Sequence, residues 1–285
     1  MPQRDSIGYT VGVAVVLCVV CSLVVSVAAV LLKPRQELNK KLDRQRNILD
    51  ATGLAYAETG EPASQLNAKQ VQDLYTRVEE HLVDLETGDF VEDLDPDTYN
   101  ERAAARDPQQ QVKINTSKFD PGFKFREGVV RVYFVRGPEQ EIKQVVLPVY
   151  GKGLWSTLYG YLALRSDLQT IQGLTFYEHA ETPGLGGEVD NIAWKAQWEG
   201  RWLYGEEGTP AAGVDKGPAD DDDQYLVDGL SGATITARGV TNLIRYWASD
   251  DAFGPFLEKL KADMGQGSTL ASTTAEPMGA SNGQE

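Results

Sequence analysis

The chain contains 285 residues and has a formal net charge of −15. This acidic balance argues against a nucleic-acid-binding protein, which needs a basic surface, and against docking of a folded domain on anionic lipid. A chain of this length can bury a sizeable core and suggests one or two domains.

An apolar segment close to the N-terminus is the first element along the chain. No charged residue occurs from Ser6 to Leu32, and a short segment of residues 1–10 precedes the most apolar part, residues 11–32. Twenty-two helical residues span about 33 Å, whereas the hydrocarbon core of a bilayer is about 30 Å thick. We therefore predict a single transmembrane helix over residues 11–32. The alternative is a cleaved signal peptide, but the apolar run is long for one and Arg4 is the only basic residue before it.

The basic groups that flank this segment predict its orientation. Only Arg4 and the terminal amine precede it, whereas a cluster of basic residues follows it, namely Lys33, Arg35, Lys40, Lys41, Arg44 and Arg46. The positive-inside rule would therefore place the bulk of the chain in the cytoplasm.

Both cysteines of the chain, Cys18 and Cys21, lie inside the apolar segment. The rest of the chain has no thiol, which excludes a disulfide scaffold and a cysteine-ligated cluster there. We interpret the pair as small apolar residues in lipid or against a partner helix.

Residues 33–111 are expected to form a helical connector. A first charged helix is predicted to end near Gly53 and a second to end at Gly88, with His81 solvated on the second. Residues 89–111 are acidic and then polar, and we expect a connecting segment there. The apolar positions behind these predictions are Leu38, Leu42, Ile48 and Leu49 for the first helix and Val71, Leu74, Val78, Leu82 and Leu85 for the second.

Residues 112–263 are predicted to form a mixed β-sheet domain with packed helices, which makes the fold class α+β. Short runs rich in β-branched and aromatic residues predict strands at 129–135, 145–150, 158–164, 171–177 and 225–227. Apolar spacing predicts helices at about 238–249 and 251–263. Residues 264–285 lack periodicity and are expected to be a disordered polar tail.

A loop with two glycines and several hydroxyls precedes the first of these C-terminal helices. Gly229 and Gly232 permit a tight turn or a close backbone approach, and Ser231, Thr234 and Thr236 stand at or just before the helix start. Free N–H groups and the helix dipole favour an anion at such a position. The residues alone leave two interpretations open, a phosphate site and an ordinary N-cap with a glycine loop.

The motifs of common enzyme classes are missing. The stretch GLSGA at residues 229–233 differs from the nucleophile elbow at its last position, and no phosphate-binding P-loop occurs. The two histidines are too far apart for a spaced metal motif, and the aspartates near residue 95 lack the glycine of a calcium loop, because Thr98 stands there. The acidic run 220–223 is interpreted as a solvated loop. We therefore predict neither a catalytic residue nor a metal site in this chain.

Two further glycine-containing stretches lie earlier in the sheet region, GKGLWS at residues 151–156 and EHAETPGLG at residues 178–186. Glycine loops beside Trp155 and Leu185 could admit a flat ring, with backbone groups close to its polar edge. The alternative is a pair of tight turns that pack against a core tryptophan.

Taken together, these stretches resemble the covalent FMN-binding domain family. DGLSGAT at residues 228–234 is similar to the flavinylation motif of that family, and the two earlier stretches are similar to its flavin-pocket segments. With the N-terminal span and the stretch QRNILD at residues 45–50, residues 10–263 resemble the family of C subunits of the sodium-translocating NADH:quinone oxidoreductases. The resemblance implies that Thr234 carries FMN through a phosphoester bond and that Thr236 is a cap or a phosphate neighbour. The other implied cofactor-binding residues are Trp155, Thr182, Gly184, Leu185, Asp228, Ser231, Gly232 and Ala233.

The same resemblance implies an electron-transfer flavoprotein subunit in a bacterial inner-membrane complex. That complex couples NADH oxidation and ubiquinone reduction to sodium export, and the subunit would not be active alone. The implied partners are other subunits, including a neighbouring flavin subunit, and a flavin transferase that attaches FMN. The implied location of the soluble domain is the periplasmic side, against the charge count above. The alternatives are the FMN subunit of the related ferredoxin-oxidising complex, which the connector disfavours, and a membrane-tethered binding module without redox function.

Overall fold

The computed structural model describes residues 7–265, and the chain divides into two compact units between Arg46 and Asn47. The first unit consists of most of helix α1 (Ile7–Ala51). This helix contains an 18-residue window with a mean hydropathy of 3.1, none of which is buried in the structure. The prediction of a helix that is long and apolar enough to cross a bilayer is therefore confirmed. Cys18 and Cys21 lie exposed on it as free thiols.

The second unit is built on a five-stranded sheet in the order β1-β4-β5-β6-β7, in which every neighbouring pair is antiparallel. Two small sheets accompany it, an antiparallel β2–β3 pair and a parallel β8–β9 pair. The strands are β1 (Val78–Asp84), β2 (Gln111–Lys113), β3 (Phe125–Glu127), β4 (Val129–Arg136), β5 (Ile142–Lys152), β6 (Thr157–Arg165), β7 (Ile171–Glu178), β8 (Gly213–Val214) and β9 (Leu226–Val227).

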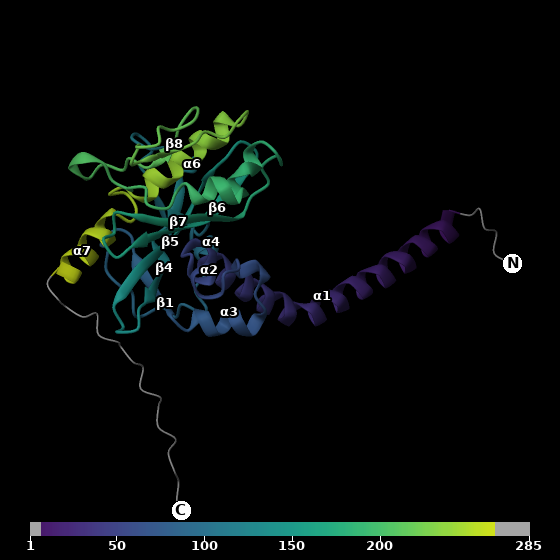
Figure 1. The fold of residues 1–285 in the computed structure, drawn as a ribbon. Helices are drawn as coiled ribbons and strands as arrows, with labels where there is room; N and C mark the ends of the chain where they lie inside the picture. The colour runs from purple at the N-terminus through teal and green to yellow at the C-terminus, as the bar shows by residue number, and fades with distance from the viewer. Residues whose placement is uncertain (1–6, 266–285) are drawn as a thin grey trace, which may run out of the picture. The chain divides into compact units, whose positions relative to one another are not determined.

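Helices lie on both sides of the main sheet (Figure 1). The first group comprises the end of α1, α2 (Leu54–Thr59), η1 (Ala63–Gln65) and α3 (Ala68–Tyr75). The short helix α4 (Glu101–Ala104) comes after β1 in the chain. The second group comprises η2 (Gly186–Asp190), α5 (Ile192–Ala196), η3 (Glu206–Gly208), α6 (Thr234–Trp247) and α7 (Gly254–Gly265). The expected α+β fold, a sheet with packed helices, is confirmed.

The apolar core lies between the sheet and the C-terminal helices. Helix α6 buries Val240, Leu243, Ile244 and Trp247, the positions that the apolar spacing predicted. The indole nitrogen of Trp247 donates a hydrogen bond of 2.8 Å to the carbonyl of Tyr150 on β5. This contact satisfies a polar group that burial would otherwise leave without a partner, and it joins α6 to the sheet.

The predicted second connector helix is wrong in its C-terminal half. Helix α3 ends at Tyr75, and residues 78–84 form β1, which pairs with β4 from Val78↔Val135 to Asp84↔Val129. The apolar residues of this stretch fit a helical spacing in the sequence, but strand pairing with β4 overrides the local pattern. His81 therefore lies on a strand, where its ring contacts Phe90 and Phe134 at centroid distances of 5.4 and 5.3 Å.

Other boundaries also differ from the predictions. The compact unit begins at Asn47, so it includes β1 and most of the region expected as a connector. Helix α6 begins at Thr234 rather than near 238, and α7 runs from Gly254 to Gly265 rather than from 251 to 263. The expected disordered tail therefore overlaps α7 at its first two positions, and residues 266–285 lie outside the described residues.

Candidate functional site

The three glycine-containing stretches come together where β5 ends and α6 begins. A Cβ atom on Gly239 of α6 would clash with the carbonyl of Lys152, and one on Gly151 would lie 2.5 Å from Leu243. A Cβ on Gly232 would lie 3.0 Å from the side chain of Leu185. The absence of side chains at these glycines thus allows residues 151–156, 179–187 and 228–239 to pack directly on one another.

The carboxylate of Glu181 connects the first of these stretches to the helix. Its Oε1 accepts hydrogen bonds from the backbone N–H of Trp155 at 2.9 Å and of Ser156 at 3.0 Å, and from the Ser156 hydroxyl at 3.2 Å. Its Oε2 accepts from the Leu154 N–H at 3.2 Å and from the Thr236 hydroxyl at 2.6 Å. Four donors from the β5–β6 loop and one from α6 therefore bind one buried side chain.

These donors also decide the charge of Glu181. Burial alone would raise its pKa, but the hydrogen bonds from Thr236 and from the backbone N–H groups of Trp155, Ser156 and Leu154 outweigh burial, so the pKa lies below its usual value. The side chain is a carboxylate at neutral pH. It is only 5% exposed, which makes it a fixed negative charge inside the site.

Two glycines make room for this carboxylate. A Cβ on Gly153 would lie 2.6 Å from its Oε1, and a Cβ on Gly186 would lie 2.7 Å from both its Oε2 and the Thr236 hydroxyl. Distances under about 3 Å are far inside ordinary van der Waals contact. Glycine is therefore required at both positions by the packing around Glu181.

A second set of hydrogen bonds fixes the segment that enters the site from β7. The Ser156 hydroxyl accepts from the Ala180 N–H at 2.8 Å, and Nδ1 of His179 accepts from the Glu181 N–H at 3.2 Å. With Nδ1 as an acceptor, the neutral ring carries its proton on Nε2, which lies 2.8 Å from the Asp190 carboxylate. The segment between β7 and η2 is thus held by His179 together with Ser156 of the β5–β6 loop and Asp190 of η2.

The hydroxyls near the start of α6 differ sharply in accessibility. Thr234 is the first residue of the helix and is exposed, and Ser231 and Gly232 just before it are exposed too. Gly232 has a φ of 68°, the left-handed conformation that glycine adopts at little cost. The residue before the helix, Ala233, has no side-chain cap, so the first N–H groups of α6 have no capping side chain.

The prediction that Thr236 caps the helix is wrong. The N-cap residue is Ala233, whereas the side chain of Thr236 is 1% exposed and donates to Glu181. Helix α6 begins about four residues earlier than predicted, so Thr236 lies inside its first turn, and its side chain is buried there.

Asp228, at the start of the loop, directs its carboxylate into the protein. Its Oδ2 accepts from the side-chain amide of Gln197 and its Oδ1 from the N–H of Ala219, both at 2.9 Å. Both oxygens therefore bind protein groups of neighbouring segments.

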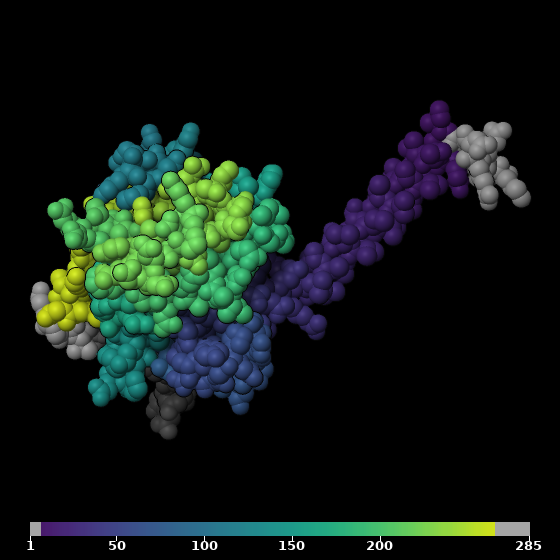
Figure 2. All heavy atoms as spheres, turned by 45° about the horizontal axis from the view of Figure 1, so that its top comes forward, coloured from purple at the N-terminus to yellow at the C-terminus, as the bar shows by residue number. Residues whose placement is uncertain are grey.

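Large apolar side chains remain exposed around Thr234. Trp155 is 69% exposed, and Leu154, Leu185 and Ile235 are each between 43% and 47% exposed. Thr182 and Gly184 are exposed on the same loop as Leu185. Figure 2 shows that the chain after β7, in green to yellow, forms one face of the second unit. Neighbouring exposed apolar groups with backbone amides between them are typical of a site for a flat, partly polar ring.

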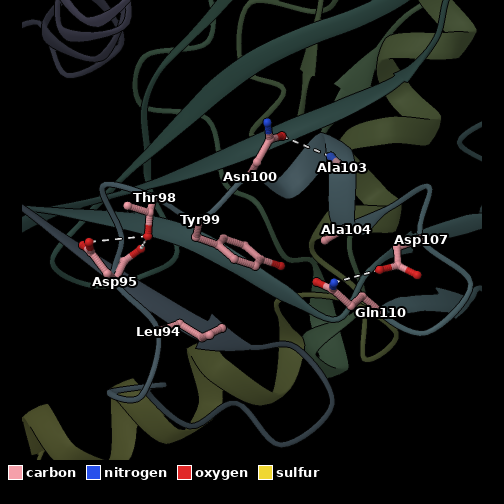
Figure 3. A pocket seen from close by; sticks show the side chains of 9 residues that line it. All are labelled: Leu94, Asp95, Thr98, Tyr99, Asn100, Ala103, Ala104, Asp107 and Gln110. Carbon is pink, nitrogen blue, oxygen red and sulfur yellow. Dashed lines mark hydrogen bonds between the residues drawn. The ribbon is translucent and has the colours of Figure 1, made fainter.

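A hollow of about 340 Å³ lies elsewhere, between residues 94 and 110. Figure 3 shows three hydrogen bonds within the segment, between Thr98 and Asp95, between Asn100 and the Ala103 N–H, and between Gln110 and Asp107. The hydroxyl of Tyr99, which also lines the hollow, donates to the carbonyl of Val129. None of the predicted site residues lines it. We interpret the three bonds within the segment as local turn and cap interactions rather than as a ligand site.

The sequence prediction missed two residues of this site, Glu181 and Gln197. Glu181 stands inside the stretch EHAETPGLG, whose resemblance to a flavin-pocket segment was an available signal. Gln197 carries no such signal, because its contact with Asp228 depends on the tertiary fold.

Comparisons with known proteins agree with this geometry. The model of the family described as FMN-binding domain matches residues 153–249, a range that contains Trp155, Glu181 and Thr234. The C subunit of the Na(+)-translocating NADH-quinone reductase from Yersinia pestis is 44% identical over 260 residues, covering 91% of this chain and 95% of that protein. The C subunit from Pseudomonas aeruginosa is 43% identical over 265 residues, covering 92% and 98%.

Solved structures support the fold. The crystal structure of Shewanella oneidensis NqrC matches with a TM-score of 0.71 and 34% identity, covering 79% of this chain and 99% of that chain. The structure of the corresponding Na(+)-translocating NADH-quinone reductase subunit from Parabacteroides distasonis matches with a TM-score of 0.60 at 24% identity and supports the fold alone. The curated relatives named here carry the NADH-quinone reductase name, which favours that family over the ferredoxin-oxidising alternative.

Proposed function

The chain belongs to the family of C subunits of the Na(+)-translocating NADH-quinone reductases and contains an FMN-binding domain, and from this we propose that it relays electrons through FMN bound covalently to Thr234. FMN supplies the redox chemistry by accepting and donating electrons, and the protein positions it. In this proposal the complex couples NADH oxidation and ubiquinone reduction to sodium export, and the electrons pass to a neighbouring flavin subunit.

The residues around Thr234 suit FMN. The exposed faces of Trp155 and Leu185 offer apolar contact to the isoalloxazine ring, and the backbone at Thr182 and Gly184 lies beside them. The uncapped start of α6 offers N–H groups and the positive end of the helix dipole to the phosphate. The single observation that carries the proposal is the exposed hydroxyl of Thr234 at this helix start, within the matched FMN-binding region.

The covalent bond has a defined balance of atoms. The Thr234 oxygen forms a bond to the flavin phosphorus, the hydroxyl proton is released, and a bond from that phosphorus to another oxygen breaks. Condensation with FMN itself would expel water, which is unfavourable in aqueous solution. We therefore propose a donor in which the phosphate is already an anhydride, such as flavin adenine dinucleotide, with adenosine monophosphate as the leaving group and a flavin transferase as the catalyst.

The mass of the intact chain tests the attachment site. We expect the full chain from a bacterial host with a flavin transferase to carry one FMN phosphoester on the peptide that contains Thr234. Thr234→Ala is expected to fold and insert without covalent flavin. Flavin retained on Thr234→Ala, or found on Ser231, would overturn the assignment.

The bacterial inner membrane and a periplasmic location of the second unit are part of the proposal. One helix in a multi-subunit complex can be oriented by its partners, against the basic residues that follow the span. A reporter that is active only in the periplasm, fused after Glu285, is expected to be active. Activity of a cytoplasmic reporter at the same position would contradict this topology.

A further inference from the structure

The loop that leads to the attachment residue Thr234, residues 228–233 (the attachment loop), is held at its start by the end of α5. All three polar groups of Asp228 bind this helix end. The Asp228 N–H donates to Oε1 of Gln197 at 2.9 Å, and Gln197 Nε2 donates back to the Asp228 carboxylate at 2.9 Å. The indole nitrogen of Trp194 donates to the Asp228 carbonyl at 2.8 Å.

The start of the attachment loop also forms hydrogen bonds with residues 217–219. The Ala219 N–H donates to the second oxygen of Asp228, and the Gly229 N–H donates to the Gly217 carbonyl at 2.7 Å. A Cβ on Gly229 would lie 2.7 Å from the carbonyl of Asp215, so this contact is close packing of backbone on backbone. The acidic run that follows Ala219 is therefore attached to the loop start through Asp228.

The far end of the loop is fixed by a separate contact. Thr236, two residues beyond Thr234, is buried and bonded to Glu181. The stretch from Asp228 to Thr236 thus has a fixed residue at each end, whereas Ser231, Gly232 and Thr234 between them are exposed. Fixing both ends restricts the positions that the hydroxyl of Thr234 can take.

We propose that Gln197 and Trp194 are positioning residues for the flavin, acting through Asp228 to set the path of the attachment loop and hence the orientation of the attached ring. This assigns the aspartate of the loop a contact with α5 rather than with the cofactor. The inference rests on the proposed attachment of FMN to Thr234. It assigns a role to a short helix that no sequence motif connects with the site.

Hydrogen exchange of the full chain without flavin, in detergent, tests the contact directly. Gln197→Met keeps the length of the side chain and removes both hydrogen bonds to Asp228. We expect amide exchange over residues 226–234 to become at least about tenfold faster, which corresponds to about 1.4 kcal/mol, because the change removes a hydrogen bond to a charged group. The matched control is Gln144→Met, which removes the 3.1 Å bond from Gln144 to the Thr52 carbonyl far along the chain from the loop.

An exchanged pair distinguishes positioning from general loosening. Gln197→Glu places two carboxylates face to face, and Asp228→Asn leaves one acceptor oxygen for the two donors, Gln197 Nε2 and the Ala219 N–H, so each single change is expected to speed exchange. The double variant restores a carboxylate that accepts from the backbone N–H and from the new amide, and exchange is expected to return to the wild-type rate. The proposal fails if Gln197→Met leaves exchange unchanged, if Gln144→Met speeds it equally, or if the double variant is no slower than the singles.

The attached flavin gives a second readout. With FMN on Thr234, we expect lower fluorescence anisotropy of the flavin in Gln197→Met than in the wild-type chain. In double-variant protein that carries FMN, the anisotropy is expected to return to the wild-type value. Equal anisotropy in wild type and Gln197→Met would overturn the orienting role. A wild-type chain without covalent flavin would instead refute the attachment itself, and the exchange experiment on the flavin-free chain would still decide the contact with α5.

Discussion

The hydroxyl of Thr236 donates a 2.6 Å hydrogen bond to the carboxylate of Glu181, a residue 55 positions earlier in the chain. The bond joins the start of α6 to the loop after β7, and the same carboxylate accepts the N–H groups of residues 154–156. Three stretches that are separate in sequence thus depend on one side chain for their mutual placement.

Replacing Thr236 by valine is expected to destabilise the flavin-free chain by about 1–3 kcal/mol, because a buried carboxylate loses one of its donors. The measurement is thermal or denaturant unfolding in detergent. Thr234→Val is the matched control, since Thr234 is exposed and its change should stay within about 0.5 kcal/mol. Equal destabilisation by the two variants would contradict the role assigned to the Glu181 contact.

Gly186→Ala is expected to destabilise the chain by about 1–3 kcal/mol through overpacking. The added methyl would lie 2.7 Å from both Glu181 and Thr236, which are bonded to each other and cannot both move away. Gly217→Ala has nothing within 4 Å of the added atom and serves as the control in the same unfolding experiment. A stable Gly186→Ala protein with normal flavin content would show that the site can open around Glu181.

Trp155→Ala is expected to leave the stability of the flavin-free chain within about 0.5 kcal/mol, because the side chain is 69% exposed. In the flavin-loaded chain we expect faster quenching of flavin fluorescence by iodide, since the ring loses an apolar neighbour. Trp202→Ala, a change at a 40% exposed tryptophan opposite Thr170, is the control and should not alter quenching. Unchanged quenching in Trp155→Ala would remove Trp155 from the flavin site.

Glu127→Gln is expected to change how stability depends on pH. Burial raises the pKa of Glu127 from 4.5 to about 7, although the hydrogen bond from Tyr150 acts to lower it. Because the folded state holds this proton more tightly than the unfolded chain, the stabilisation is complete below about pH 4.5 and is lost as the pH rises through 7.

The loss amounts to at most about 3 kcal/mol, from 1.36 kcal/mol per pKa unit. Glutamine has no proton to lose and still accepts from Tyr150, so the variant should gain stability relative to wild type between pH 5 and 8. The exposed Glu92→Gln is the control. Parallel pH profiles for wild type and Glu127→Gln would contradict the raised pKa.

The sequence predicted those helices and strands whose local residue pattern matches the structure that they adopt in the fold. Strands β4 to β7 are rich in β-branched and aromatic residues, and α6 buries the four apolar positions that its spacing marked. Strand β1 was missed because Val78, Leu82 and Leu85 also fit a helical spacing, and only pairing with β4 decides between the two. Strands β2, β3 and β8 have two or three residues each and carry no periodicity that could be read.

The sequence likewise predicted some residues of the candidate site but not their contacts. Motif resemblance selected Trp155, Leu185 and Thr234. All three are exposed in the structure, and the stretches that contain them pack against one another. It could not give the hydrogen-bond partners of side chains, so the bonds of Thr236 to Glu181 and of Asp228 to Gln197 were not predicted. Those partners are 55 and 31 positions away in the sequence.

The hydrogen bonds around Glu181 have a consequence for the speed of electron transfer. When a redox group gains an electron, nearby dipoles that are free to rotate turn toward the new charge, and the energy of that rearrangement slows the transfer. Here the N–H groups of residues 154–156 and the hydroxyl of Thr236 already point at a permanent carboxylate. Dipoles fixed before the reaction do not have to reorient during it. We therefore expect a flavin at this site to gain and lose electrons with a small reorganisation energy.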